Sequence, residues 1–249
     1  MRLFLFAVLI SLSALLASCS LPAVEGGESV EPNSAQPPAT GDRHPVVVEL
    51  FTSEGCSSCP PADRNLTFLE TQQPVTQAEI ITLAFHVDYW DRLGWKDRFS
   101  SPLFSQRQND YSRALKLDSN YTPQMIVDGS AEFVGSDSGR AAKEVLTAAG
   151  SAKASIGLEE NASRLSVKIT NAPKHSEATV YAAIAEDGIT SRVERGENSG
   201  KTLEHISVVR ELKNLGTLTV DKNELELSGD LELRPDWKLE NLKVVVFVQ

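Results

Sequence analysis

The sequence predicts an α/β domain over residues 45–150, followed by a β-sandwich-like unit over residues 151–249. The first half alternates apolar runs of strand length with helical patterns. This order is typical of a sheet with parallel strands and crossover helices. The second half consists of short alternating runs separated by turn residues, as expected for antiparallel sheets that pack face to face.

The strands and helices of the first half are predicted from hydrophobic patterning. Residues 45–51 form a continuous apolar run rich in β-branched side chains, which predicts a strand buried on both faces. A loop with two cysteines and a short helical pattern come next, and residues 80–87 predict a second buried strand. A further helical pattern begins at Ser101, a residue type that caps helices, and Pro102, which suits the first helical position.

A hairpin and a helix complete the first half. Residues 123–135 predict two strands joined by a turn at Asp128 and Gly129, and the following helix is expected to end at Gly150. In the second half we expect a helical or irregular piece around residues 206–216 among the strands. We expect a surface salt network or a contact between the domains from four ionisable side chains of this half: Arg195, Glu197, His205 and Arg210.

The composition is that of an acidic globular protein. The chain has 249 residues, of which 41% are hydrophobic and 23% are charged, and its net charge is −10. It contains no run of five or more basic residues. Because binding to a phosphate backbone needs clustered Lys and Arg, nucleic acid is not expected as a partner.

The N-terminal residues 1–19 predict a secretory signal peptide. One basic residue, Arg2, precedes an apolar run that is too short for a comfortable membrane span. The run ends in Leu16-Ala17-Ser18-Cys19, which resembles the bacterial lipobox, so Cys19 is the expected lipidation site. An ordinary cleaved signal peptide is the alternative. With Ser20 after the cysteine, a Gram-negative host would place the protein at the outer membrane.

Residues 20–44 predict a flexible tether. They are rich in Pro, Gly, Ser and Glu and nearly free of large apolar residues, so they cannot bury a core. A lipid anchor followed by such a segment would hold the folded part on the periplasmic side of a bacterial membrane. With Cys19 lipidated, one pair of cysteines, Cys56 and Cys59, remains in a compartment that permits disulfides.

The stretch FTSEGCSSCPPAD places Cys56 and Cys59 between the first strand and the first helix. A CxxC pair in this position is typical of thiol redox proteins, because the N-terminus of a helix stabilises a thiolate. In such pairs the first cysteine is normally the nucleophile and the second resolves the mixed disulfide. No cofactor is needed for this chemistry.

The element order and the sequence Tyr121-Thr122-Pro123 together resemble the thioredoxin fold. The resemblance implies a cis peptide bond before Pro123, on the strand that faces the CxxC. It also implies that Thr122 lines a substrate groove, to which we add Tyr121 and Trp90 as expected substrate contacts. Glu49, in the lead-in ELFTSEGC, would be the buried carboxylate that moves protons, although this chain has one extra residue before the first cysteine.

Four stretches resemble more closely a family of uncharacterised secreted proteins with a thioredoxin-like domain. They are ELFTSEGCSSCPPAD, AFHVDYWDRLGWKDRF, YTPQMIVDG and RGENSGKTLEHISVVREL, and the resemblance covers roughly residues 45–249. It implies the fold. It implies no activity, since this family is known mainly as a domain of unknown function.

Two prolines distinguish this CxxC from that of thioredoxins. Pro60 and Pro61 cannot donate the backbone hydrogen bonds of a helix that runs through the second cysteine. A helix that starts near Pro60 would direct its dipole at Cys59 more than at Cys56, which leaves the identity of the nucleophile open. We favour Cys56, by the resemblance and because Gly55 leaves room for its approach.

Metal binding and a structural role are the alternatives. His86 and Asp88 lie at the carboxyl end of the second strand, where α/β sheets place their sites. A copper site of Cys56, Cys59 and His86 is one alternative, whereas a structural zinc site lacks a fourth ligand. A non-catalytic binding module braced by the disulfide is the other alternative.

The leading hypothesis is therefore an extracytoplasmic thiol–disulfide oxidoreductase that acts on protein thiols or disulfides.

Overall fold

The structure is a computed structural model that describes residues 43–161 and 164–249. These residues belong to one compact unit. The expected signal peptide, the lipidation site at Cys19 and nearly all of the expected tether lie outside the described residues.

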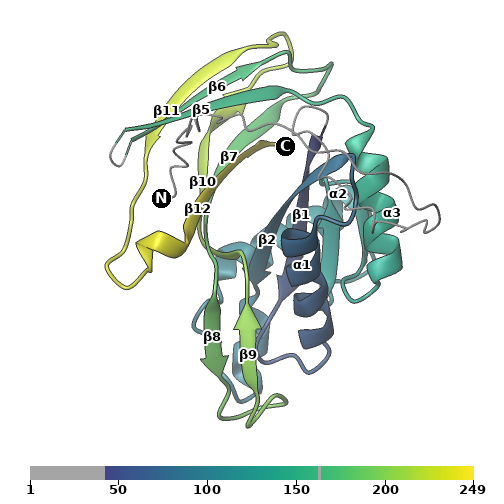
Figure 1. Cartoon of the computed structure of the whole chain (residues 1–249), viewed down its shortest axis with the longest axis vertical. Coiled ribbons are helices and arrows are strands. Elements are labelled where there is room, and N and C mark those ends of the chain that lie inside the picture. Colours follow the sequence, from purple (N-terminus) through teal and green to yellow (C-terminus); the bar gives the residue numbers. More distant parts are fainter. Residues whose placement is uncertain (1–42, 162–163) are drawn as a thin grey trace, which may run out of the picture. The chain divides into compact units, whose positions relative to one another are not determined.

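The centre of this unit is a seven-stranded mixed sheet with the strand order β12-β7-β10-β2-β1-β3-β4 (Figure 1). Its strands are β1 (His44–Thr52), β2 (Ala78–His86), β3 (Gln124–Val127), β4 (Ala131–Val134), β7 (Ala178–Glu186), β10 (Val208–Leu218) and β12 (Leu242–Val248). β1 and β2 run parallel, whereas β3 and β4 form an antiparallel hairpin at the edge. The strands expected at residues 45–51 and 80–87 are confirmed.

Helices cover the β1 half of this sheet on both faces. α1 (Pro60–Gln72) and α3 (Ser138–Ala149) pack on Val46, Val48 and Leu50 of β1, which point to one face. α2 (Pro102–Leu115) packs on Phe51 and Phe85, which point to the other face. Strand side chains alternate between faces, so consecutive residues of β1 reach different helices.

The helix boundaries follow the expected signals. The hydroxyl of Ser101 accepts a hydrogen bond from the backbone N–H of Leu103, and α2 begins at Pro102. α3 ends at Ala149, with Gly150 as its C-cap. Asp128 and Gly129 both have positive φ in the turn between β3 and β4. Two short 3-10 helices also occur, η1 (Asp88–Leu93) and η2 (Leu239–Asn241).

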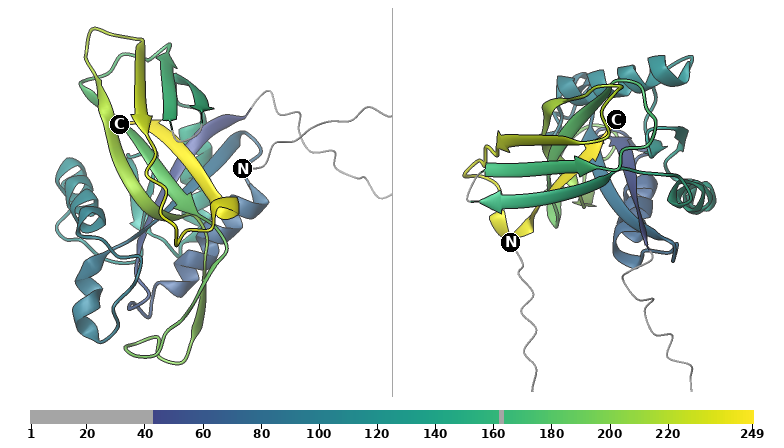
Figure 2. Two further views of the ribbon diagram at one scale, coloured as in Figure 1. Left: turned by 90° about the vertical axis from the view of Figure 1, so that its left-hand side faces the viewer. Right: turned by 90° about the horizontal axis from the view of Figure 1, so that it is seen from above.

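A second layer covers the β7 half of the sheet. The three-stranded antiparallel sheet β11-β6-β5 consists of β5 (Ser155–Asn161), β6 (Arg164–Thr170) and β11 (Leu225–Asp230). Its buried side chains, among them Val167 and Ile169, pack on Val180 and Ile184 of β7. Figure 2 shows these two sheets lying one over the other, so the expected face-to-face packing of sheets is present.

The expected separation into two units is not what the sheet shows. β7, β10 and β12, which come from residues 151–249, join the sheet of the first half, and β10 pairs with β2 at Val208 and Ala84. The apolar side chains Phe51 and Phe85 are covered partly by Val209 and Phe247 from this half. One core therefore draws on both segments.

The piece expected to be helical or irregular at residues 206–216 lies mainly in strand β10. Its pairing with β7 shifts register between Val209 and Glu211 and again between Asn214 and Gly216. Each irregularity interrupts the alternation of apolar and polar side chains, which explains why the pattern did not predict a strand.

The remaining two strands form a separate hairpin. β8 (Ile189–Arg192) and β9 (Thr202–His205) pair only with each other in the described part of the chain. Figure 1 shows this hairpin extending past the end of the large sheet, beside the N-terminal end of α1.

Candidate functional site

Cys56 and Cys59 form a disulfide in the loop between β1 and α1. Both residues are fully buried, with an exposed fraction of 0%. Ser57 and Ser58 between them are exposed. The hydroxyl of Ser58 lies 3.4 Å from the sulfur of Cys56.

The helix begins after the second cysteine. Cys59 is the N-cap of α1, and Pro60 and Pro61 are its first two residues. The carbonyl of Cys59 accepts hydrogen bonds from the backbone N–H groups of Ala62 and Asp63. The positive end of the helix dipole therefore lies closer to Cys59 than to Cys56, as the two prolines suggested.

Thr122 and Trp90, two of the expected substrate contacts, lie together next to this loop. The peptide bond between Thr122 and Pro123 is cis, as expected, and Pro123 is buried at the start of β3. The carbonyl of Thr122 accepts a hydrogen bond from the hydroxyl of Ser58 at 3.5 Å. The indole N–H of Trp90 donates to the hydroxyl of Thr122 at 2.8 Å. The side chain of Tyr121 instead contacts Glu132 on β4.

Glu49 does not lie where the expected role requires. Its carboxylate accepts two hydrogen bonds from the guanidinium of Arg107 on α2, at 2.6 and 2.8 Å, and another from the hydroxyl of Tyr111. α2 covers one face of the sheet, and α1, which follows the cysteines, covers the other. The one extra residue before Cys56 explains this placement, because a shift of one position in a strand reverses the face.

Asp63 is a carboxylate of α1, on the cysteine side of the sheet. It follows Cys59 by four residues, a spacing that places two side chains on the same face of a helix. Its carboxylate accepts a hydrogen bond from the hydroxyl of Thr52 at 2.8 Å. Burial raises the pKa of Asp63, although His205 and His86 act against that rise. The sequence signal that could have found it is the spacing in CPPAD.

A small cavity connects Asp63 with the protein surface. It has a volume of about 160 Å³ and lies between the first turn of α1 and strand β9. Its lining residues are Pro60, Asp63, Arg64, Thr202, Leu203 and Glu204. A proton on Asp63 therefore has a short way to solvent.

A buried network of ionisable groups lies beside the cysteine loop. The carboxylate of Glu54 accepts a hydrogen bond from the indole of Trp95 at 2.7 Å and lies 3.3 Å from Nε2 of His205. The carboxylate of Asp97 lies 2.6 Å from Nδ1 of His86 and accepts a hydrogen bond from the backbone N–H of Glu54. Glu54, Asp97, His86 and His205 are all buried.

The network favours the charged forms of His86, Asp97 and Glu54. Burial by itself would lower the pKa of His86, but the charge and hydrogen bond of Asp97 raise it above the ordinary value. Burial would raise the pKa of Asp97 and the charge of His86 lowers it, with a net decrease. Burial and the hydrogen bond with His205 oppose each other in the same way at Glu54, whose pKa is also lowered.

His86, the third residue of the copper alternative, uses one ring nitrogen to contact a carboxylate. Its Nδ1 contacts Asp97, and its buried Nε2 has no hydrogen-bond partner among the residues that the structure describes. Over residues 43–161 and 164–249, no three Cys, His, Asp or Glu side chains are placed to hold a metal ion. Asp88, the other residue noted at the end of the second strand, accepts a hydrogen bond from Ser105 on α2.

The loop between β8 and β9, residues 193–201, covers the cysteine loop. The side-chain N–H groups of Asn198 donate to the carbonyls of Glu54 and Cys56 at 2.8 and 2.9 Å. The carboxylate of Glu197 accepts a hydrogen bond from the backbone N–H of Ser57 at 2.9 Å. Glu197 and His205 therefore contact the site directly, whereas Arg210 forms ion pairs with Glu186 and Asp236.

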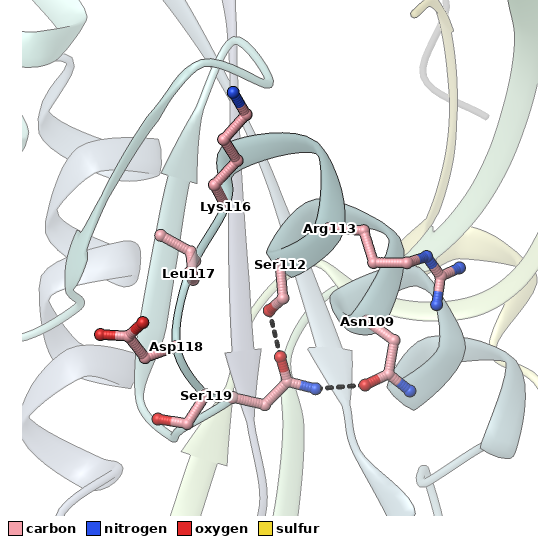
Figure 3. A pocket seen from close by; sticks show the side chains of 8 residues that line it. Asn109, Ser112, Arg113, Lys116, Leu117, Asp118 and Ser119 are labelled. Atoms are coloured by element: carbon pink, nitrogen blue, oxygen red, sulfur yellow. Dashed lines mark hydrogen bonds between the residues drawn. The ribbon is translucent and has the colours of Figure 1, made fainter.

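A larger pocket lies elsewhere, at the C-terminal end of α2 and the loop after it (Figure 3). Its volume is about 370 Å³, and its lining residues are Asn109, Ser112, Arg113, Lys116, Leu117, Asp118, Ser119 and Asn120. Three of its polar side chains, Ser112, Asn120 and Asn109, bond to one another. It contains none of the residues of the disulfide site.

The fold and the site define a mixed α/β protein with a buried CxxC disulfide. Residues 47–249 match the family described as "Protein of unknown function (DUF1223)", and the chain belongs to this family. No curated protein sequence is similar to the chain. None of the described helices is both long and apolar enough to cross a membrane.

Two solved structures are similar to the chain. One is protein AGR_C_4864 from Agrobacterium tumefaciens, which is 28% identical, with a TM-score of 0.61; the match covers 74% of this chain and 78% of that one. The other is HBP35 of Porphyromonas gingivalis, which is 14% identical, with a TM-score of 0.55; the match covers 83% of this chain and 69% of that one. At that identity, the second similarity concerns the fold alone.

Proposed function

We propose that this protein is an extracytoplasmic thiol–disulfide oxidoreductase with a thioredoxin-like active site. The observation that carries the proposal is the Cys56–Cys59 disulfide between a central strand and a helix N-terminus, with Thr122 and Pro123 beside it. Helix N-termini stabilise thiolates, and redox-active cysteine pairs occur in such surroundings.

Cys56 attacks first in this mechanism. Its thiolate attacks one sulfur of a substrate disulfide, the substrate S–S bond breaks, and one substrate thiolate leaves. The product is a mixed disulfide between Cys56 and the substrate. Ser58 has its hydroxyl 3.4 Å from the sulfur of Cys56 and is placed to donate a hydrogen bond to the thiolate.

Cys59 completes the exchange. Its thiol transfers a proton to a base, and the resulting thiolate attacks the sulfur of Cys56, which releases the second substrate thiolate. Two electrons have then passed to the substrate, and the protein is left as the disulfide. The reverse sequence oxidises a substrate dithiol.

We assign the base to Asp63 in place of Glu49. Asp63 lies one helical turn after Cys59 and reaches solvent through the small cavity. Glu49 is occupied by Arg107 on the opposite face of the sheet. A carboxyl group with a raised pKa is a better proton acceptor near neutral pH than an ordinary one.

The proposed location is the periplasmic side of a bacterial membrane. A signal peptide over residues 1–19, a lipid at Cys19 and a tether over residues 20–44 would keep the domain close to the membrane and to exported protein substrates. Intact-mass measurement of the mature protein and of a Cys19→Ala variant tests this. A diacylglyceryl modification that the variant lacks is the expected result.

The reduction potential of the Cys56–Cys59 pair is the direct test of the function. It can be measured by thiol trapping in glutathione buffers on residues 42–249, which retain only these two cysteines. A potential between about −270 and −120 mV, the span of known exchange proteins, supports the proposal. Exchange activity that survives unchanged in a Cys56→Ser variant would refute it.

A binding module with a structural disulfide is the second candidate. The complete burial of both cysteines under the β8–β9 loop favours it. A reduction potential below about −300 mV, typical of structural disulfides, would support this candidate over the first.

A further inference from the structure

The exposed loop between β8 and β9 has one buried residue in its centre. The residues from Glu194 to Lys201 are exposed, except for Asn198, whose exposed fraction is 0%. The side chain of Asn198 points under the loop, where its N–H groups bond to the carbonyls of Glu54 and Cys56. Its side-chain oxygen accepts a hydrogen bond from the ammonium group of Lys201 at 2.9 Å. All the polar groups of this buried amide are therefore satisfied.

Side chains of the same loop form hydrogen bonds with the backbone polar groups around the first cysteine. Glu197 accepts the N–H of Ser57, and Asn198 donates to the carbonyl of Cys56. In an open site these backbone groups would be available for hydrogen bonds to an extended peptide. The loop side chains thus bond to the backbone N–H of Ser57 and the carbonyl of Cys56, which a peptide substrate would need as partners.

The loop also rests on the segment after η1. Gly196 has a φ of +76° and approaches Trp95 so closely that an added Cβ would lie 3.3 Å from the Cβ of Trp95. Gly200 has a φ of +81°. Glycine tolerates these conformations without the steric cost that other residues carry, so both positions suit a tight loop that packs closely on its neighbour.

We propose that the β8–β9 loop is a gate over the Cys56–Cys59 pair, with Asn198 as the residue that keeps it closed. Neither cysteine is exposed, and the loop bonds to the backbone of Ser57 and Cys56, so the gate opens for another thiol by a movement of this loop. As a means of substrate selection this inference rests on the thiol–disulfide exchange proposed above. The control of access to the sulfurs does not depend on it.

The hydrogen bonds that hold the loop on the cysteine segment are few. Three hydrogen bonds connect the loop with the cysteine segment: Asn198 donates two, and Glu197 accepts one. Individual hydrogen bonds contribute little net free energy, so a loop held in this way can open without unfolding the domain. A partner that offers its own backbone to Ser57 and Cys56 would compete with the loop for the same groups.

The test is the rate at which the disulfide is reduced. Dithiothreitol and a larger reductant, a reduced protein dithiol, are each mixed with the oxidised protein, and free thiols are trapped over time. We expect Asn198→Ala to raise the rate with dithiothreitol about tenfold and Glu197→Ala to raise it a few-fold, since each removes contacts that close the gate. The increase should be greater for the protein dithiol, because a larger molecule needs a wider opening.

Two control variants separate gating from other effects. Arg195→Ala changes an exposed residue of the same loop and should leave both rates unchanged. Ile169→Ala removes volume from the core under the three-stranded sheet and lowers the global stability away from the loop. Glu197 is exposed, so its variant will fold even if Asn198→Ala does not.

Three results would overturn the gate. The first is unchanged reduction rates in the Glu197 and Asn198 variants. The second is an equal acceleration in Ile169→Ala, which would mean that the sulfurs become accessible by global unfolding. The third is the same factor for both reductants, which would indicate altered reactivity of the disulfide itself. None of these results depends on catalysis, so the gate remains supported even if the exchange proposal fails. The exchange proposal likewise remains supported if the gate is refuted.

Discussion

Asp63 acts, in the proposed mechanism, on the cysteine that precedes it by one helical turn. It is partly buried, hydrogen-bonded to Thr52, and lies at a cavity that leads to solvent. Removal of its charge should slow the step in which Cys59 loses its proton. It should leave the first attack by Cys56 largely unaffected, because that thiolate forms before the mixed disulfide exists.

For Asp63→Asn we therefore predict accumulation of the mixed disulfide and a resolving step slower by about 10²-fold at pH 7, the lower end of what a positioned base contributes. Quenched-flow trapping with mass spectrometry measures the intermediate. The deficit should shrink as the pH rises, since hydroxide can then deprotonate Cys59. Asp110→Asn, on the exposed side of α2, is the matched control; equal resolving rates in all three proteins would remove Asp63 from the mechanism.

The pair of His86 and Asp97 makes stability depend on pH. The folded state raises the pKa of His86, so the stabilisation from protonated His86 is complete below its unfolded pKa, about 6.5, and is lost as the pH rises through the higher folded pKa. The folded state lowers the pKa of Asp97, so the stabilisation from its charge is present above about pH 3.9 and is lost as the pH falls through the lower folded pKa.

We accordingly predict that the free energy of unfolding of the oxidised protein is greatest between about pH 4 and 6.5 and decreases toward alkaline pH. Urea denaturation at a series of pH values measures this. In Asp97→Asn the decrease above pH 6.5 should be much smaller, because the charge that favours protonated His86 is gone. An identical alkaline decrease in the variant would show that other groups cause it.

At the scale of elements, α2 is joined to the sheet by a buried ion pair. The guanidinium of Arg107 contacts Glu49 of β1, and it also donates to the side chain of Gln249, just after β12, at 2.8 Å. It lies over several aromatic rings, among them Phe85 and Phe247. Burial would lower the pKa of Arg107, but Glu49 raises it well above the ordinary value, so the guanidinium is charged.

We predict that Glu49→Gln lowers the free energy of unfolding by about 3–5 kcal/mol, because it leaves the buried guanidinium without its counter-charge. Chemical denaturation measures the change. Asp110→Ala breaks the exposed ion pair with Arg113 on the same helix and should cost less than about 1 kcal/mol. If Glu49 were instead the base of the exchange reaction, its variant would lose the resolving step at undiminished stability.

The elements differ in how well their patterns predicted them. β1 and β2 are buried on both faces and read as continuous apolar runs, and the proline after Ser101 marks the start of α2. β10 was missed because two shifts of its pairing register interrupt its alternation. The start of α1 at Pro60 followed from proline chemistry alone, since the missing N–H of proline is tolerated only in the first turn.

At the scale of the whole molecule, the two halves of the chain share a sheet and a core. Val209, Ala183 and Phe247 from the second half pack in the same cluster as Phe51 and Phe85. A boundary near residue 150 therefore separates two sequence patterns but does not separate two cores. The loop that covers the disulfide also comes from the second half.

We predict that residues 43–150 do not fold as a stable domain by themselves. Without β7, β10 and β12, the edge of β2 and the aromatic cluster on the α2 face would be exposed to water. Circular dichroism during urea denaturation should show no cooperative transition for this fragment, in contrast to residues 43–249. A sharp transition with well-dispersed amide resonances would restore the two-domain description.

The sequence by itself determined the local features of this protein. It predicted the CxxC pair between a strand and a helix and the helix start at the prolines, because each depends on a few adjacent residues. The cis bond before Pro123 was implied by the resemblance to the thioredoxin fold. Tertiary structure alone decided the surroundings of the sulfurs. The side chain of Glu49 lies on the face of the sheet that α2 covers, where it contacts Arg107. Asp63 lies one helical turn after Cys59 on the other face and contacts Thr52. Asn198 reached Cys56 from 142 residues away, by a fold of the chain that no local pattern encodes.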